Sequence, residues 1–206
     1  ASKRRTEMRS ALGLAQGRFV LWAGQPDGDN SYWTLARLLE GFDRRQVTLL
    51  FRAHPREVAY AQGKYHALFA QTSMNVVDVS LHPDALSLYC ASDLVVTQFS
   101  SAGAEASYLG TPALFVLFDD LGKQYLRSFK GYDRLPWCAG GCSFLVEREE
   151  EVAAVMERAL FDGAAREQVR ASFQRRFGAQ EASAEVIAHR ILTAVGEWQD
   201  VVRGAK

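Results

Sequence analysis

The sequence lacks several features that mark large classes of protein. Its 206 residues contain no run of 18 apolar residues, so a membrane-spanning helix is not expected. Its 24 basic and 24 acidic side chains balance, which removes the electrostatic case for a nucleic-acid partner. The first residues lead into no hydrophobic region of the kind that a secretory signal needs. These absences favour a cytoplasmic globular protein.

Cysteine is also scarce, with Cys90, Cys138 and Cys142 as the three examples. Three cysteines suit a reducing compartment better than a framework of disulfides. Cys138 and Cys142 are spaced like half of a zinc site, but no second pair of ligands accompanies them. We therefore expect neither a metal nor a structural disulfide.

Three common catalytic motifs are missing. The loop 24–28, GQPDG, breaks the spacing of GxGxxG after the first apolar run, which disfavours a Rossmann dehydrogenase. There is no GxxxxGK[ST] phosphate loop and no GxSxG nucleophile elbow. His66 and His189 lie inside helical patterns, where a histidine of the surface or core is the simpler interpretation. His54 lies between two arginines at the end of a predicted strand, and both a structural role and a ligand role remain open for it.

The sequence does contain six short apolar runs that alternate with helical patterns. We predict strands over Phe19–Ala23, Val47–Phe51, Asn75–Val79, Leu94–Thr97, Ala113–Phe118 and Ser143–Val146. We predict helices over residues 3–16 and 31–42, from Pro55 to about Ala70, and over 84–90, 101–109, about 122–129, 152–160, 169–177 and 182–202. The alternation predicts an α/β fold: one Rossmann-like domain with a doubly wound six-stranded parallel sheet of order 3-2-1-4-5-6 and C-terminal helices.

This order predicts where a ligand binds. Connections reverse direction between the first and fourth strands, and ligands of such folds lie outside the carboxyl ends of those strands. The loop 24–30 then lies beside Gln98–Gly103, which opens a helix whose free N–H groups and dipole favour an anion. Ser100 or Ser101 could equally serve only as a helix cap, and Glu105 could accept hydrogen bonds from sugar hydroxyls or merely favour the dipole.

Two stretches resemble a known family. Ser100-Ser101-Ala102-Gly103-Ala104-Glu105-Ala106, then Gly110-Thr111-Pro112 and Gln124, is similar to the donor-binding half of GT-B nucleotide-sugar enzymes. The likeness extends to the UDP-GlcNAc transferases that make lipid II, to UDP-GlcNAc 2-epimerases and to CDP-glycerol glycerophosphotransferases. The last of these also show an Arg-x-His-Pro element like Arg52-Ala53-His54-Pro55. The resemblance covers nearly the whole chain from Phe19 onward.

The resemblance implies a role for each matching residue. Ser100, Ser101, Ala102 and Gly103 would hold the diphosphate of the donor, and Glu105 would bind the ribose hydroxyls. Further donor-binding positions are implied in four groups: Gly24 and Gln25 on the opposite wall, Leu81 and His82 at the base, Asp119, Lys123 and Gln124 at the sugar, and Arg52 and His54 near the diphosphate. No cofactor or metal is implied, and a UDP-sugar is the first expectation for the substrate.

The resemblance also implies the function. We expect the C-terminal donor-binding half of a longer GT-B glycosyltransferase, with an N-terminal acceptor-binding domain in the same polypeptide and a role in cell-envelope polysaccharide synthesis. The whole enzyme could lie at the inner face of the membrane, and the isolated half would be inactive; no catalytic residue is identified. Two alternatives stay open: a UDP-sugar 2-epimerase or hydrolase using the same pocket, and a non-catalytic module that senses a nucleotide or binds a protein.

Overall fold

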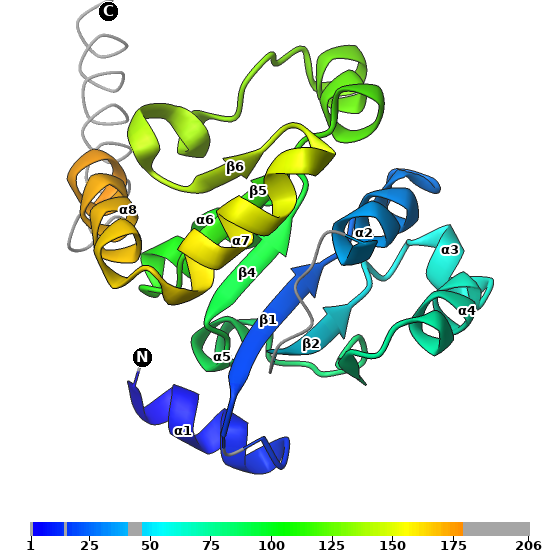
Figure 1. Ribbon diagram of the computed structural model, residues 1–206, viewed down its shortest axis with the longest axis horizontal. Coiled ribbons are helices and arrows are strands. Elements are labelled where there is room, and N and C mark those ends of the chain that lie inside the picture. Colours follow the sequence, from blue (N-terminus) through cyan, green and yellow to red (C-terminus); the bar gives the residue numbers. More distant parts are fainter. Residues whose placement is uncertain (1, 15, 41–46, 179–206) are drawn as a thin grey trace, which may run out of the picture.

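The structure, a computed structural model, describes residues 2–14, 16–40 and 47–178 (Figure 1). Its centre is a six-stranded parallel sheet of order β3-β2-β1-β4-β5-β6, which confirms the predicted fold class and strand order. The strands are β1 (Arg18–Ala23), β2 (Val47–Arg52), β3 (Asn75–Asp78), β4 (Leu94–Thr97), β5 (Ala113–Val116) and β6 (Phe144–Val146). All six coincide with predicted strands to within one or two residues.

The central strands are apolar throughout because both faces of the sheet are covered. Successive side chains of a strand point to opposite faces. Val20 and Trp22 of β1 therefore pack in one hydrophobic cluster, whereas Phe19 and Leu21 pack in another on the opposite face.

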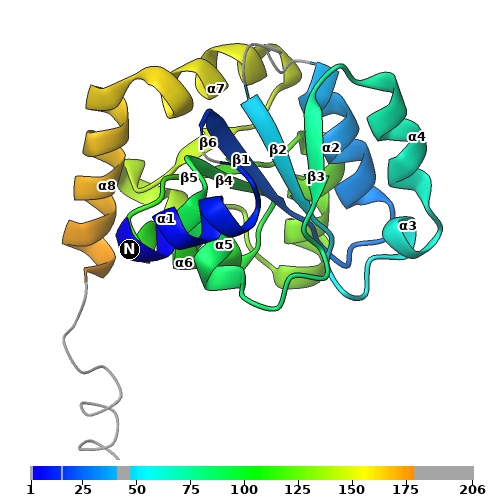
Figure 2. The same cartoon turned by 90° about the horizontal axis from the view of Figure 1, so that it is seen from below.

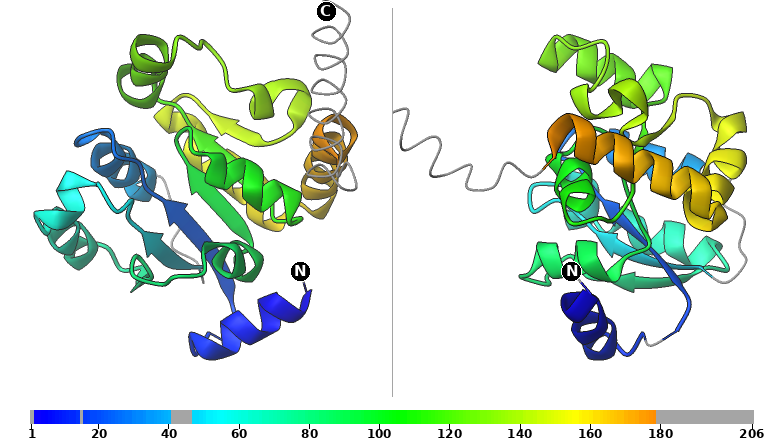
Figure 3. Two further views of the ribbon diagram at one scale, coloured as in Figure 1. Left: turned by 180° about the vertical axis from the view of Figure 1, so that it is seen from behind. Right: turned by 90° about the vertical axis from the view of Figure 1, so that its left-hand side faces the viewer.

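Helices cover the two faces in separate layers, as Figure 2 shows. The helices α2 (Asn30–Glu40), α4 (Lys64–Gln71) and α7 (Val152–Phe161) pack on the face of Val20 and Trp22. The opposite face carries α1 (Ser2–Ala11), α5 (Ala85–Ala91) and α6 (Ser101–Tyr108), and Figure 3 views it directly in its left panel. The helix α8 (Gly163–Phe177) contacts both α6 and α7. The remaining short helices are α3 (Val58–Ala61), η1 (Asp119–Lys123), η2 (Leu126–Lys130), η3 (Pro136–Gly141) and η4 (Glu149–Glu151).

One helix prediction is wrong in detail, and another helix is longer than predicted. The helix predicted from Pro55 to about Ala70 is two helices, because Gly63 adopts a left-handed backbone conformation with φ of 70° between α3 and α4. Pro55 lies in the preceding turn and does not begin a helix. The helix predicted at about 122–129 is confirmed and is longer, since the backbone is helical from Asp119 to Lys130. Most of it is π-helical, in η1 and η2, and it ends before Gly131, which has φ of 69°. The predicted helix at 182–202, with His189, lies outside the described residues.

The helix α1 is attached to the amino end of β4 through one buried carboxylate. Asp93 accepts hydrogen bonds from Arg5 (2.6 Å), Arg9 (2.9 Å) and the backbone N–H of Phe19 (2.8 Å). Burial by itself raises the pKa of Asp93, but the Phe19 N–H and the two arginines outweigh it, so that the pKa is lowered. The beginning of β4 is thereby held at the edge opposite the candidate site.

Candidate functional site

The carboxyl ends of β1 and β4 lie side by side, as the predicted topology requires. The two strands pair in parallel, with Trp22 opposite Val96. At their ends, Gln25 Nε2 donates to Thr97 Oγ1 at 3.2 Å, and Thr97 Oγ1 donates to the carbonyl of Ala23 at 2.8 Å. The loop after β1 and the turn after β4 are therefore joined by side chains, and the predicted neighbourhood of Gly24–Asn30 and Gln98–Gly103 is confirmed.

The turn after β4 ends in a capped helix. Ser100 is the N-cap of α6, and its Oγ accepts a hydrogen bond from the N–H of Ala102 at 3.2 Å. Ser101 and Glu105 are exposed, and the Ser101 hydroxyl donates to Glu105 Oε1 at 2.8 Å. The capping role of Ser100 is thus shown. The exposed pair Ser101 and Glu105 remains accessible to a ligand.

Gly103 has a packing role that the sequence did not reveal. A Cβ at this position would lie 2.4 Å from Cζ of Phe115, so a larger residue would clash with the sheet. Its N–H donates to the carbonyl of Ser100 at 3.3 Å. The residue is buried, and contact between Gly103 and a diphosphate stays a prediction.

The loop after β2 is fixed by backbone contacts. The Arg52 guanidinium donates to the carbonyl of His82 at 2.6 Å, which ties the end of β2 to the loop after β3. His54 Nδ1 accepts the N–H of Arg56 at 3.1 Å. Burial and the charge of Arg56 lower the pKa of His54, which favours the neutral imidazole. Leu81 is 90% exposed, while the Nδ1 atom of His82 accepts the N–H of Asp84.

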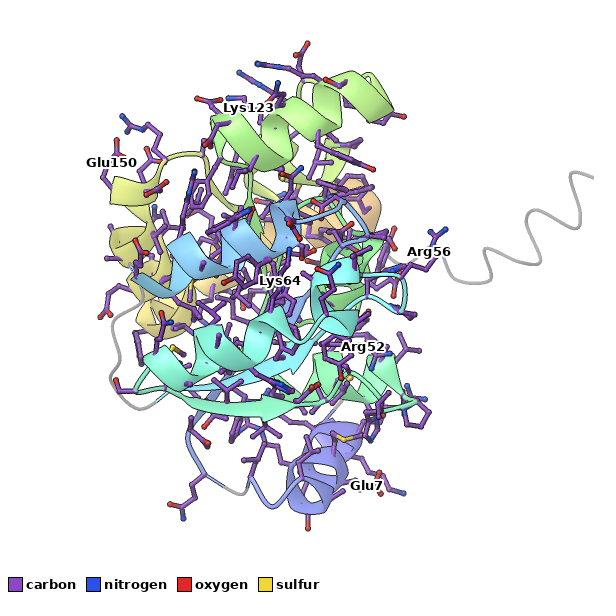
Figure 4. All side chains as sticks on the ribbon, turned by 90° about the vertical axis from the view of Figure 1, so that its right-hand side faces the viewer. Glu7, Arg52, Arg56, Lys64, Lys123 and Glu150 are labelled. Carbon is purple, nitrogen blue, oxygen red and sulfur yellow. The ribbon has the colours of Figure 1, made fainter. Side chains whose placement is uncertain are left out.

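The residues after β5 lie apart from this loop. Lys123 Nζ lies 2.9 Å from Asp119 and 2.8 Å from Glu147, and these carboxylates raise the pKa of Lys123. Figure 4 shows Lys123 well away from Arg52. Gln124 is exposed. The structure thus does not bring Lys123 together with Arg52. The positive charge of Lys123 is already compensated by the carboxylates of Asp119 and Glu147.

One aromatic contact links this segment to the turn after β4. The ring of Phe99 stacks on that of Tyr125, with centroids 5.1 Å apart and planes within 8° of parallel. Tyr125 directly follows Gln124 in the sequence and lies between η1 and η2. The stack brings the segment predicted to face the donor sugar next to the turn predicted to hold the diphosphate.

Sequence reasoning missed two buried carboxylates, one in the loop after β1 and one in the loop after β2. Asp27 and Glu57 are 6% and 2% exposed. Burial, aided by the nearby Glu57, raises the pKa of Asp27 to about 7, and burial also raises that of Glu57. Asp27 lies in a loop rich in turn-forming residues, where capping is the ordinary interpretation. Its Oδ1 atom does accept the N–H of Ser31 in the first turn of α2, at 3.0 Å.

Two negative findings concern the described ranges 2–14, 16–40 and 47–178. No group of three or more His, Cys, Asp or Glu side chains in them is arranged to hold a metal ion. No helix in them has the length and apolar character needed to span a bilayer.

Comparison with known families gives one match over nearly the whole chain. The family described as CDP-Glycerol:Poly(glycerophosphate) glycerophosphotransferase matches residues 3–194. No curated protein matches the sequence.

Several solved structures share the fold. The wall teichoic acid polymerase TagF aligns with a TM-score of 0.62 at 17% identity, over 96% of this chain and 48% of its own. Anabaena Alr3699/HepE in complex with UDP-glucose aligns with a TM-score of 0.62 at 17% identity, over 96% and 53%. The catalytic domain of cholesterol-α-glucosyltransferase from Helicobacter pylori gives 0.52 at 13%, over 77% and 97%. The chain therefore spans about half the length of TagF and HepE.

Proposed function

Because the chain belongs to the CDP-glycerol:poly(glycerophosphate) glycerophosphotransferase family, we propose that it binds the donor for a transferase of this kind, with CDP-glycerol as the donor. The match over residues 3–194 carries the proposal, since it includes both loops that flank the ends of β1 and β4. The fold is that of the donor-binding domain of GT-B glycosyltransferases, and this likeness supports a nucleotide-activated donor.

The family description supports a glycerophosphate transfer as the reaction of the whole enzyme. In a glycerophosphate transfer, a hydroxyl oxygen of the acceptor forms a bond to the phosphorus that carries the glycerol. The P–O bond to the other phosphate breaks, the hydroxyl proton leaves, and CMP departs with the bridging oxygen. Negative charge develops on that leaving phosphate, so N–H and hydroxyl donors aimed at it would lower the barrier.

We propose that the start of α6 supplies such donors. Backbone N–H groups and hydroxyls of Ser100, Ser101, Ala102 and Gly103 would face the diphosphate, aided by the positive end of the helix dipole. Glu105 would exchange the Ser101 hydroxyl for the ribose hydroxyls. The remaining donor-binding assignments are those proposed from the resemblance: Gly24, Gln25, Arg52, His54, Leu81, His82, Asp119 and Gln124. The resemblance also assigns Lys123, but its ammonium is held by Asp119 and Glu147, and we propose no donor contact for it.

Titration calorimetry on the 206-residue chain tests donor binding. CDP-glycerol, CDP, UDP and UDP-glucose would be compared, and Glu105→Ala should weaken the binding of the preferred nucleotide with almost no change in Tm. A matched control is Asp162→Ala, which removes the N-cap of α8 away from the site and should lower stability by about 1 kcal/mol with unchanged nucleotide binding. Absence of binding by all four compounds at millimolar concentration would contradict the proposal.

The alternative donor is a UDP-sugar, in which C1 of the sugar is attacked and UDP leaves. Its structural support is the likeness to HepE, whose structure contains UDP-glucose. Assaying an intact enzyme that pairs this chain with its acceptor-binding half would separate the two reactions. Release of CMP marks glycerophosphate transfer, and release of UDP marks sugar transfer or, without an acceptor, hydrolysis or epimerisation.

A further inference from the structure

Glu57 is a buried carboxylate that lies between the loops after β1 and β2. Its Oε2 atom accepts the backbone N–H of His54 at 2.9 Å, and its own N–H donates to the carbonyl of His54 at 2.9 Å. The residue is only 2% exposed, so it cannot itself touch a ligand in the crevice. Its contacts with His54 are nevertheless made at the backbone that sets where the imidazole lies.

The same carboxylate also lies against the first loop. A Cβ at Gly24 would come within 2.3 Å of Glu57 Oε2 and 3.2 Å of the His54 nitrogen. The N–H of Gly24 in turn donates to the carbonyl of Arg52 at 2.9 Å. The absence of a side chain at Gly24 thus allows the carboxylate and the two loops to meet at one point.

The second carboxylate oxygen of Glu57, Oε1, is held by a side chain of the core. The hydroxyl of Tyr65 donates to Oε1, and Tyr65 is 2% exposed. The Tyr65 ring packs on Phe51 of β2, with centroids 4.5 Å apart. The carboxylate is therefore held by a side chain that is itself part of the core, and its position relative to β2 is fixed.

We propose that Glu57 is a positioning residue of the donor site, which acts through His54 and Gly24. It joins the loops after β1 and β2 into a single wall, so that both face the donor at a fixed spacing. This inference rests on the proposed function, because it concerns the residues that would bind the donor. A purely apolar side chain at 57 would fill the space but leave the His54 N–H without an acceptor.

Three substitutions separate positioning from simple stability. Glu57→Gln keeps an oxygen for the His54 N–H and offers its amide N–H₂ to the Tyr65 hydroxyl oxygen, so the wall should persist. Glu57→Asp is one methylene shorter and cannot span from His54 to Tyr65. Thr111→Val is the matched control, since it removes a buried hydrogen bond, from the Thr111 hydroxyl to the carbonyl of Tyr89 at 2.9 Å, that touches neither Glu57 nor the two loops.

The test is the Kd for CDP-glycerol on the folded 206-residue chain, with UDP-glucose in parallel, together with Tm. We expect Glu57→Asp to weaken donor binding about 10-fold or more, because small displacements of positioned groups have large effects. The Kd of Glu57→Gln should stay within about threefold of that of the original chain, and Thr111→Val should lower Tm with unchanged Kd. A Kd for Glu57→Asp within twofold of the original would overturn the proposal.

Hydrogen exchange is a second test. It needs no ligand, so it can also be applied to a variant that has lost donor binding. Hydrogen exchange of the His54 amide should be faster in Glu57→Asp, relative to the amides of β2, and unchanged in Glu57→Gln. Equal exchange in all variants would overturn the positioning role. If instead the unsubstituted chain binds neither donor, the proposed function fails, whatever the exchange rates show.

Discussion

Gly103 in the first turn of α6 lies directly against the ring of Phe115 in β5, where a Cβ would stand 2.4 Å from Cζ. Phe115 is fully buried in the central sheet. The helix that presents Ser101 and Glu105 therefore rests on the sheet through a bare backbone at this point. Its distance from the strands is set by one glycine and one aromatic ring.

Gly103→Ala should accordingly destabilise the protein. Overpacking of this kind costs about 1–3 kcal/mol, partly offset by the better helix propensity of alanine. Urea denaturation would measure the change. The double variant Gly103→Ala with Phe115→Leu should lose less than the sum of the two single changes, because leucine vacates the ring's edge. Additive losses would show that the contact does not limit the packing.

Asp27→Asn should change the pH dependence of stability. Burial raises the pKa of Asp27 to about 7, so the folded protein retains a proton that the unfolded chain has lost. Stability must then fall as pH rises from about 4 to about 7, and the loss is complete above that range. Asparagine keeps the acceptor for Ser31 but has no charge, so the variant should be more stable at pH 8 by about 1–3 kcal/mol.

Chemical denaturation at pH 5 and pH 8 would test this change. In the described residues, Asp27 Oδ2 and Gln98 Oε1 are both buried without a hydrogen-bond partner. A proton on the carboxyl group, or the amide of asparagine, supplies a donor that such acceptors lack. The exposed substitution Glu7→Gln serves as control and should leave the difference between the two pH values unchanged. An Asp27→Asn variant that loses the same stability at pH 5 and at pH 8 would contradict the raised pKa of Asp27.

The sequence predicted the sheet because its signal is local. Runs such as Leu94–Thr97 are apolar at every position, which is what burial on both faces requires. The topology followed from general rules for parallel sheets, and it correctly placed the loop after β1 beside the end of β4, where Gln25 contacts Thr97. Helix boundaries were less predictable where a single backbone conformation decided them, as at Gly63.

The candidate site was only partly predictable, since its supports come from distant parts of the chain. Glu57 and Tyr65 lie in what looked like one ordinary amphipathic helix, and nothing local indicates that they meet Gly24. Gly103 looked like a residue that allows a phosphate to approach, whereas its close neighbour is Phe115. Lys123 was predicted to lie at the donor sugar, but its ammonium is paired with Glu147 from the segment after β6.

Lys123→Met tests whether that lysine reaches the donor. Its charge is compensated by Asp119 and Glu147, so we expect the Kd for CDP-glycerol to change by less than about threefold. Calorimetric titration would measure it, with Glu147→Gln as the partner variant that releases the ammonium. A loss of tenfold or more in Lys123→Met would show that the lysine leaves its carboxylates for the diphosphate.

Asp93→Ala should destabilise the fold far from the candidate site. The substitution leaves Arg5 and Arg9 without their shared carboxylate and Phe19 N–H without an acceptor. We expect a loss of about 2–4 kcal/mol, less than for a fully buried pair because the arginines are partly exposed. Since the pKa of Asp93 is lowered, its contribution is complete above the ordinary carboxylate range and disappears as pH falls through the lower value. In urea denaturation, the difference in the free energy of unfolding between variant and original chain should be smaller at pH 3 than at pH 7.

The stacked rings of Phe99 and Tyr125 restrict how this protein could be re-engineered for another donor. Exchanging residues 119–135 for the equivalent stretch of a relative would be the obvious way to change the transferred group. Such a graft brings its own residue at 125, and one without a flat ring there would lose its alignment with the turn after β4. A functional chimera would therefore have to take the residues at positions 99 and 125 from the same relative.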